Sequence, residues 1–163
     1  MARFVVVLPL VPLAAGDEFT VADWPLHVTL VEPFLTELDA TEVATAVAGV
    51  AENAAPVHAR ADEEAMFGRR RDVPVTLVRD GGELAVLRER TLDALRDVGI
   101  DLDRIRERND FRPHVTRKQH GHLAPGSRVV LDSLAIVDMR PPEGAHHRSV
   151  VRSWRLGQPD DGR

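Results

Sequence analysis

The chain has 163 residues, of which 44% are hydrophobic, 29% charged and 4% aromatic, with no cysteine and a formal net charge of −5. These values are typical of a globular domain that buries its own core, and the lack of cysteine excludes disulfides, thiol nucleophiles and cysteine-ligated metal centres. The negative charge argues against a protein that coats long stretches of nucleic acid, and the scarcity of aromatic residues argues against a stacking platform for several bases.

The N-terminal segment predicts a buried strand over residues 3–8, where β-branched residues follow one another up to Pro9. The same stretch imitates a secretory signal peptide, but Pro9 and Pro12 interrupt it and its basic region is the single Arg3. No other segment approaches the length of apolar sequence that a membrane helix needs. We therefore expect a cytoplasmic protein with no membrane partner.

The next segments predict a loop over residues 9–24, a strand over 26–31 and a helix over about 40–53. Glu32-Pro33 is expected to end the strand, because proline cannot continue a paired ladder. The helix is predicted from Asp39-Ala-Thr-Glu42, which has the spacing of a capping box and precedes valines at helical intervals.

The remaining elements follow from alternation, helical periodicity and glycine breaks. A helix with a left-handed cap at Gly99 is expected after Asp80-Gly81-Gly82, and one further helical turn within residues 100–110. The predicted strands are 57–67, 73–78, 111–118, 128–139 and 147–156. A basic turn over 68–72, a turn over 140–144 and a disordered tail over 158–163 complete the chain.

This order of elements predicts an α+β fold with about seven strands and two main helices. We expect one domain over residues 1–157, in which antiparallel sheets surround a central cleft and the helices pack outside. One helix follows the strand at residues 26–31, whereas the other precedes the strand at 111–118. If the two halves arose by duplication, the order of their elements has therefore been exchanged or the similarity has been lost.

A repeated tripeptide is the most informative feature of the sequence. Pro25-Leu-His-Val-Thr29 and Arg112-Pro-His-Val-Thr116 both place His-Val-Thr shortly after a proline, in opposite halves of the chain. Alternate residues of a strand share a face, so each copy presents a histidine and a threonine together while its valine points the other way, into a core. Two such faces brought together would form a pocket with two proton-transfer groups and two hydroxyl donors.

Two histidines on either side of one phosphate can supply both the general base and the general acid that its cleavage needs. A neutral imidazole takes a proton from water or a ribose hydroxyl, and an imidazolium gives one to the leaving oxygen. Threonine hydroxyls can donate to the non-bridging oxygens, so the chemistry needs no metal or cofactor. The arrangement fits cleavage, or its reverse, of a phosphodiester that is cyclic or has a neighbouring 2′-hydroxyl.

With its two His-Val-Thr motifs, the sequence resembles the 2H phosphoesterase superfamily, which includes LigT-like 2′-5′ RNA ligases and 2′,3′-cyclic phosphodiesterases. The segments that carry the resemblance are Arg3–Pro9, Leu26–Phe34, Phe111–Thr116 and Trp154–Leu156, so it covers roughly residues 3–156. It implies a bilobal fold with pseudo-twofold symmetry and two antiparallel sheets around a cleft. Two features depart from the family: the segment between the first strand and the first motif is too short for the helix that many relatives carry, and Arg117 replaces an apolar residue.

Carried over by position, the resemblance implies His27 and His114 as the acid–base pair and Thr29 and Thr116 as the phosphate-holding pair. Which histidine is the base depends on the direction of the bound substrate and is left open. The expected partner is a nucleotide or RNA end with a cyclic phosphate or a 2′-5′ linkage, bound by a monomer without an obligate protein partner.

Other residues beside the motifs are candidates for substrate contacts. Arg112 and Arg117 could each contact the phosphate or face solvent. Trp24 and Phe34 flank the first motif and could stack on a base, or anchor a loop and pack in the core, respectively.

Two further groups have ordinary explanations. Arg69, Arg70 and Arg71 could reach an RNA backbone, although a short basic turn is usually only a solvated hairpin tip. His114, His120 and His122 lack the accompanying carboxylate pattern of a metal site, so a solvated loop is the better interpretation of the last two, and we expect no metal.

The leading hypothesis from the sequence is a metal-independent phosphodiesterase or RNA end-processing enzyme of hydrolase type. The alternative is a non-catalytic domain that binds a nucleotide or RNA end in the same cleft, and a third hypothesis is a structural or partner-binding domain. For the enzyme of the leading hypothesis, the sequence does not distinguish between RNA ends, signalling oligonucleotides and ADP-ribose cyclic phosphate as the natural substrate.

Overall fold

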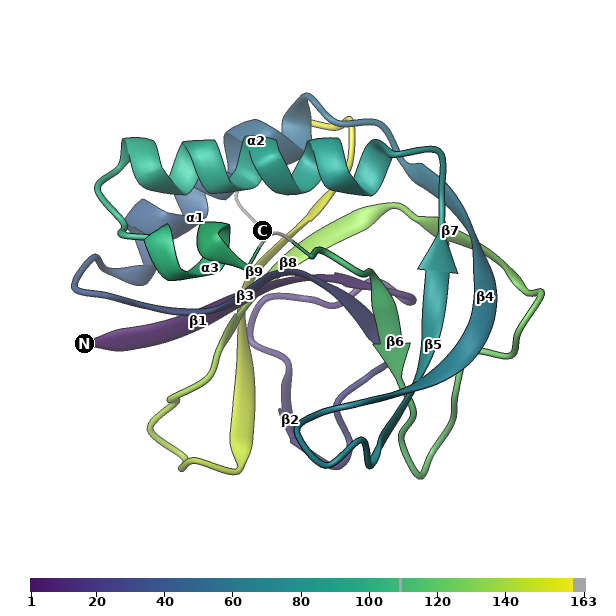
Figure 1. Cartoon of the computed structure of the whole chain (residues 1–163). Helices are drawn as coiled ribbons and strands as arrows, with labels where there is room; N and C mark the ends of the chain where they lie inside the picture. The colour runs from purple at the N-terminus through teal and green to yellow at the C-terminus, as the bar shows by residue number, and fades with distance from the viewer. Residues whose placement is uncertain (109, 160–163) are drawn as a thin grey trace.

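A computed structural model of the chain describes residues 1–108 and 110–159. In this part of the chain, strands and helices follow one another in a mixed order (Figure 1). The elements are β1 (Ala2–Pro9), β2 (Glu18–Thr20), β3 (His27–Thr36), α1 (Ala40–Glu52), β4 (Val57–Phe67), β5 (Val73–Arg79), α2 (Glu83–Asp97), α3 (Asp103–Glu107), β6 (His114–Thr116), β7 (Arg128–Leu131), β8 (Ser133–Asp138) and β9 (His147–Arg155).

The strands form one antiparallel sheet in the order β2-β9-β8-β1-β3-β6-β5-β4-β7. Its two halves meet where β3 pairs with β6 through Val28 and Val115. The predicted α+β class is therefore confirmed. The two expected sheets are joined by this short pairing into one curved, nine-stranded sheet (Figure 1).

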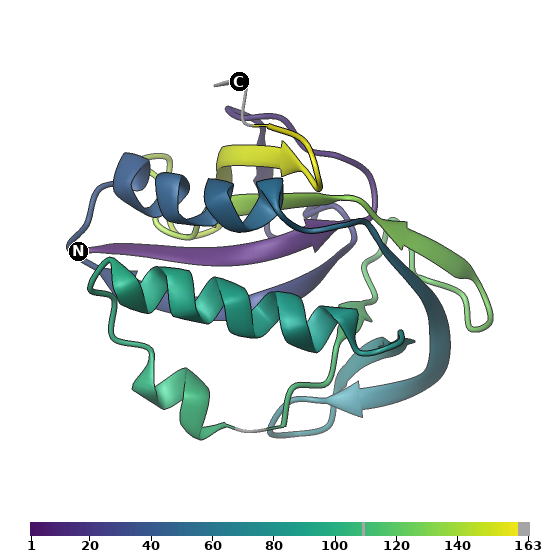
Figure 2. The ribbon, with the colours of Figure 1, turned by 90° about the horizontal axis from the view of Figure 1, so that it is seen from above.

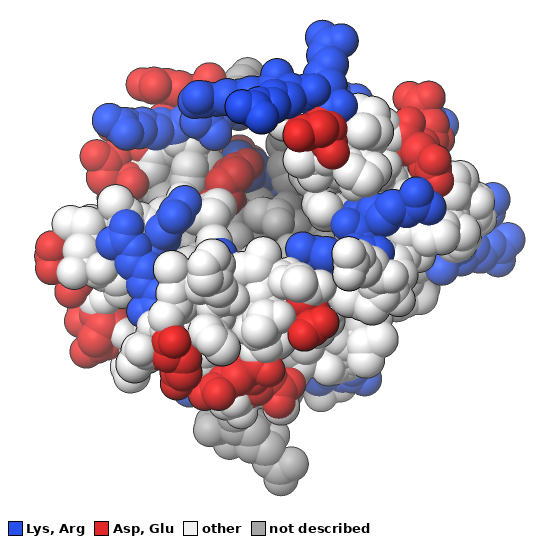
Figure 3. All heavy atoms as spheres, turned by 90° about the horizontal axis from the view of Figure 1, so that it is seen from below, with Lys and Arg blue, Asp and Glu red and all other residues white. Residues whose placement is uncertain are grey.

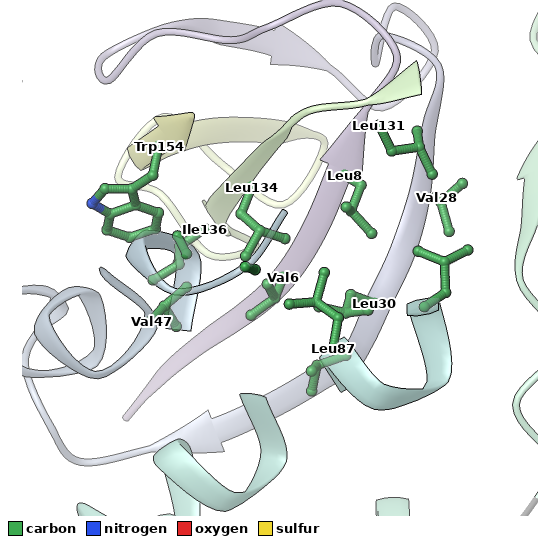
Figure 4. Close-up of a cluster of buried hydrophobic side chains, with 14 of the residues drawn as sticks. Val6, Leu8, Val28, Leu30, Val47, Leu87, Leu131, Leu134, Ile136 and Trp154 are labelled. Atoms are coloured by element: carbon green, nitrogen blue, oxygen red, sulfur yellow. The ribbon is translucent and has the colours of Figure 1, made fainter. Parts of the chain in front are cut away.

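Helices α1 and α2 pack beside one another over one face of the sheet (Figure 2). The main core lies beneath them, where buried strand side chains meet those of the helices (Figure 4): Val6, Leu8, Val28, Leu30, Val47, Leu87, Leu134, Ile136 and Trp154. A smaller cluster lies on the opposite face of β1, β8 and β9, and contains Val5, Val7, Trp24, Ala135, Val137 and Val150.

Local signals placed the helices correctly. Asp39 accepts from the backbone N–H of Glu42 at 2.9 Å and the Glu42 side chain returns to the Asp39 backbone, so the predicted capping box is confirmed. The Asp80 carboxylate accepts from the Leu84 N–H at 2.7 Å at the start of α2, and Gly99 has the left-handed φ of 98° expected after its end.

The strand predictions need four corrections. Strand β3 continues through Pro33 to Thr36, β6 is confined to His114–Thr116, and the strand predicted over 128–139 is divided at Asp132 into β7 and β8. The segment predicted as a loop over 9–24 contains the short β2. The described residues 10–26, between β1 and β3, form no helix.

Strand β3 accommodates Pro33 because its pairing with β1 is irregular there. Val7 is opposite Thr29 and Val6 is opposite Val31, and Phe4 is opposite Phe34, so extra residues of β3 are inserted twice. A bulge leaves the inserted residue unpaired and turns neighbouring side chains to a different face, which is where a proline is tolerated in a strand.

In the part of the chain that the structure describes, no helix is long and apolar enough to cross a membrane. Of the tail predicted over 158–163, residues 160–163 lie outside the described part of the chain.

Candidate active site

The two His-Val-Thr motifs lie side by side on β3 and β6. Val28 is paired with Val115, so in an antiparallel ladder His27 is opposite Thr116 and Thr29 is opposite His114. Both valines are almost fully buried beneath the helices, as predicted. The two histidines and two threonines therefore share the other face of the sheet, with the histidines diagonal to each other at a Cα separation of about 7–8 Å.

Both imidazoles are held by the same local contact. The Nδ1 of His27 lies 2.8 Å from the carbonyl oxygen of Pro25, and the Nδ1 of His114 lies 2.9 Å from that of Arg112. A carbonyl oxygen only accepts, so each Nδ1 carries a hydrogen and donates it. Each Nε2 is thereby left to accept a proton when the ring is neutral, or to donate one when it is charged.

His27 lies in a more enclosed environment than a surface histidine. The Trp24 ring stacks on it at a centroid distance of 4.4 Å, and Trp24 is itself buried between Phe19 and Arg148. Burial is the main cause that lowers the pKa of His27 from 6.5 to about 4; the hydrogen bond to Pro25 opposes this shift, and the positive charges of Lys118 and His114 contribute to it. His27 is therefore neutral at neutral pH.

This lowered pKa predicts a loss of stability in mild acid. As the pH falls from about 6.5 to about 4, unfolded His27 takes up a proton while the folded side chain stays neutral, which favours unfolding. Between pH 7.5 and pH 4.5 the free energy of unfolding should fall by roughly 2–3 kcal/mol more in the native protein than in His27→Gln. Urea unfolding at the two pH values measures this difference. Equal losses in both proteins would show that His27 is not buried as described.

His114 is positioned by an aromatic neighbour at the end of β4, in its own half of the sheet. The edge of its ring meets Phe67 at a centroid distance of 4.6 Å and an interplanar angle of 67°. The Arg112 guanidinium lies over the same Phe67 ring, 5.0 Å from its centroid. Phe67 thus connects the histidine to a cation at the mouth of the site.

A cleft of about 560 Å³ opens beside Thr29 and His114. Its other lining residues are Glu32, Met66, Phe67, Gly68, Arg71, Arg108, Asp110, Phe111 and Arg112. Although the chain as a whole is negative, three arginines line this cleft, and Figure 3 shows Lys and Arg side chains gathered beside a hollow on the face opposite the helices. The cleft therefore suits an anionic ligand.

One of the three arginines has an unusual backbone conformation. Arg71 has a positive φ of 51° in the turn between β4 and β5, where its N–H donates to the Gly68 carbonyl at 3.1 Å. Outside glycine this region costs free energy and is concentrated at functional sites. Of the three arginines predicted as a possible RNA contact, Arg71 lines the cleft, while Arg69 and Arg70 are exposed beside it.

Three residues expected near the substrate are placed elsewhere. Phe34 is buried in the main core against Phe4, so it does not stack on a base, and Trp24 stacks on His27 instead. Arg117 is exposed and lines a separate groove with Glu64 and His122, because it follows Thr116 onto the other face. Arg112 lines the cleft.

Sequence reasoning missed several residues that the structure brings to the site. Lys118 extends the alternation of His114 and Thr116, and its ammonium donates to the Val21 carbonyl at 3.2 Å and depresses the pKa of His27. Burial, and then the charge of Arg148, lower the pKa of Lys118 itself. The alternation could have identified Lys118, whereas nothing in the sequence points to Phe67 or Phe111.

The other histidines considered as metal ligands have separate contacts. His120 Nε2 lies 3.1 Å from the Trp24 carbonyl oxygen, and His122 lines the groove of Arg117. Among residues 1–108 and 110–159, no three histidine, aspartate or glutamate side chains come together as a metal site would require.

Comparison with known proteins gives one family. The sequence model described as the 2′-5′ RNA ligase superfamily matches residues 13–143, which include both motifs. A search of curated proteins finds no significant match.

Solved structures with the same fold cover nearly the whole chain. A protein described as a phosphoesterase is 17% identical over 97% of this chain and 100% of its own, with a TM-score of 0.61. TT0787 of Thermus thermophilus is 18% identical over 96% and 98% of the two chains, with a TM-score of 0.64. E. coli LigT complexed with 3′-AMP is 18% identical over 96% and 99%, with a TM-score of 0.62.

Proposed function

Because the chain belongs to the 2′-5′ RNA ligase superfamily, we propose that it is a metal-independent phosphodiesterase whose active site lies between the two His-Val-Thr motifs. Its substrates would be nucleotides or RNA ends with a 2′,3′-cyclic phosphate or a 2′-5′ linkage. The observation that best supports this is the pair of diagonal histidines, each held at Nδ1 by a backbone carbonyl so that both Nε2 atoms are left for proton transfer.

Hydrolysis of a 2′,3′-cyclic phosphate would need one proton acceptor and one proton donor. One imidazole takes a proton from water as the water oxygen bonds to phosphorus, and the other gives a proton to the ribose oxygen as its bond to phosphorus breaks. The hydroxyls of Thr29 and Thr116, opposite the histidines, would donate to the non-bridging oxygens, where negative charge increases in the transition state.

The surroundings of the two histidines favour His27 as the base. Trp24 encloses its ring and Lys118 adds a positive charge nearby, so a proton on His27 is disfavoured and the neutral form is ready to accept one. His114 lines the open cleft, and would then be the proton donor that faces the leaving oxygen.

The ligands of LigT, which has the same fold, support a nucleotide as the class of substrate. LigT has been solved with 3′-AMP, with NADP⁺, with phosphate and with ATP. A phosphate between the motifs of this chain would leave the cleft lined by Arg71, Arg108 and Arg112 for the rest of a nucleotide.

The proposal is tested by incubating EDTA-treated protein with 2′,3′-cyclic mononucleotides and 2′-5′ oligoadenylates and separating the products by chromatography. We expect turnover of at least one of these classes to continue in EDTA, since the proton transfers and charge stabilisation come from side chains. If every substrate stays intact, the enzyme proposal fails. Nucleotide binding without turnover would instead identify a nucleotide- or RNA-end-binding domain that uses the same cleft.

A further inference from the structure

The cleft contains a carboxylate that the phosphate chemistry does not use. Glu32 lines the same cleft as Thr29 and His114, and its side chain is about one-third exposed. A carboxylate repels a phosphate, so Glu32 is not part of the anion-binding end of the site. Its position instead suits the uncharged end of a nucleotide, which is the base.

The irregular pairing of β3 is the reason Glu32 faces the cleft. Val31, two residues after Thr29, lies in the main core opposite Val6 instead of sharing the face of Thr29. Glu32 and Pro33 together are opposite Val5, so one of the two is extra, and the Val5 side chain lies on the helix-free face. Glu32 is thus brought to the face of the motifs, about 10 Å along the strand from Thr29.

Glu32 is held in place from behind by a buried arginine of α2. Arg88 Nη1 donates to both carboxylate oxygens, at 2.9 and 3.0 Å, and to the Leu30 carbonyl at 2.8 Å. The Arg88 side chain is only 6% exposed, so the pair is fixed on its inner side. An ionised carboxylate accepts about four hydrogen bonds, so both oxygens of Glu32 can still accept a hydrogen bond from a ligand.

Phe111 completes this end of the cleft. Its ring lies against the Arg88 guanidinium at a centroid distance of 4.8 Å and lines the cleft together with Glu32. Aromatic rings provide stacking surfaces for bases. A flat apolar ring beside a fixed, acceptor-only group is the combination that a nucleobase with paired donors would fit.

We propose that Glu32, held by Arg88 and flanked by Phe111, recognises guanine in the nucleotide whose phosphate lies between the motifs. Guanine has two adjacent donors, N1–H and the N2 amino group, which match two carboxylate oxygens. Adenine and cytosine place an acceptor next to their amino group, and uracil has one donor between two carbonyls. This inference rests on the proposed function, because it assumes a phosphate at the four motif residues.

The inference is tested with the four 2′,3′-cyclic mononucleotides, comparing kcat/KM for the native protein, Glu32→Gln and Asp110→Asn. Asp110 lines the same cleft, so Asp110→Asn is a matched control that removes one negative charge. In the native protein we expect the guanine nucleotide to be preferred by roughly tenfold or more. Glu32→Gln should reduce that preference at least severalfold, whereas Asp110→Asn should change all four substrates alike and keep the preference.

Binding separates this inference from the proposed function. Calorimetric titration with 3′-GMP, 3′-AMP, 3′-CMP and 3′-UMP measures base preference even if no cyclic nucleotide is turned over. Preference for 3′-GMP that Glu32→Gln abolishes supports the guanine site whatever the turnover. Equal affinity for the four nucleotides, or a preference that Glu32→Gln leaves unchanged while thermal unfolding shows an intact fold, overturns it.

Discussion

Alanine at His27 or at His114 is expected to lower the turnover of 2′,3′-cyclic nucleotides by roughly 10²–10⁴-fold each. Each substitution removes one of the two Nε2 atoms that the backbone contacts to Pro25 and Arg112 leave free. The double variant should be little worse than either single variant, because the two proton transfers belong to one reaction step and their loss is not additive.

The pH dependence of kcat/KM distinguishes the two roles. In the native protein the acid limb should lie near pH 4, since His27 must be neutral and its pKa is lowered to about 4. His27→Ala should lose this acid limb, whereas His114→Ala should keep it. The opposite assignment would show that His114 is the base.

His58→Ala is the matched control for both variants. His58 is exposed on β4, away from the cleft, so its removal should leave activity and pH dependence unchanged. Full activity in either motif variant would contradict the proposed mechanism, provided that circular dichroism shows the native fold.

The sequence predicted those parts of the site that depend on local pattern. Within each His-Val-Thr, the period of two residues in a strand is enough to place the valine in the core and the histidine with its threonine on the other face. The capping box at Asp39 and the glycine after α2 are likewise local, and both helices begin and end close to the predicted residues.

Non-local pairing decided the parts that the sequence did not reveal. Proline after Glu32 normally ends a strand, but the partner β1 tolerates inserted residues, so β3 continues and turns Glu32 into the cleft. Trp24 is near the motif in sequence, which makes it a candidate for base stacking. The fold places it against the His27 ring, where it lowers the exposure of the histidine instead.

Arg88→Met is expected to lower the free energy of unfolding by about 2–4 kcal/mol. Beyond Val28, β3 is no longer paired with β6, so the Leu30 carbonyl has no partner on that strand. Arg88 donates a hydrogen bond to this carbonyl instead. Methionine can fill much of the apolar space but has no donor, so the buried carbonyl loses its partner and the Glu32 carboxylate loses its counter-charge.

Urea unfolding of Arg88→Met and of Arg96→Met measures this effect against a matched control. Arg96 lies on the same helix, is about 60% exposed and pairs with Asp93 at the surface, so its removal should change the free energy of unfolding by less than about 0.5 kcal/mol. If the two variants are equally stable, Arg88 does not join α2 to β3 as described. If Arg88→Met is destabilised but folded, Glu32 has lost its inner support. Base preference should then fall together with stability, whereas a change confined to stability would separate the packing role of Arg88 from the binding role proposed for Glu32.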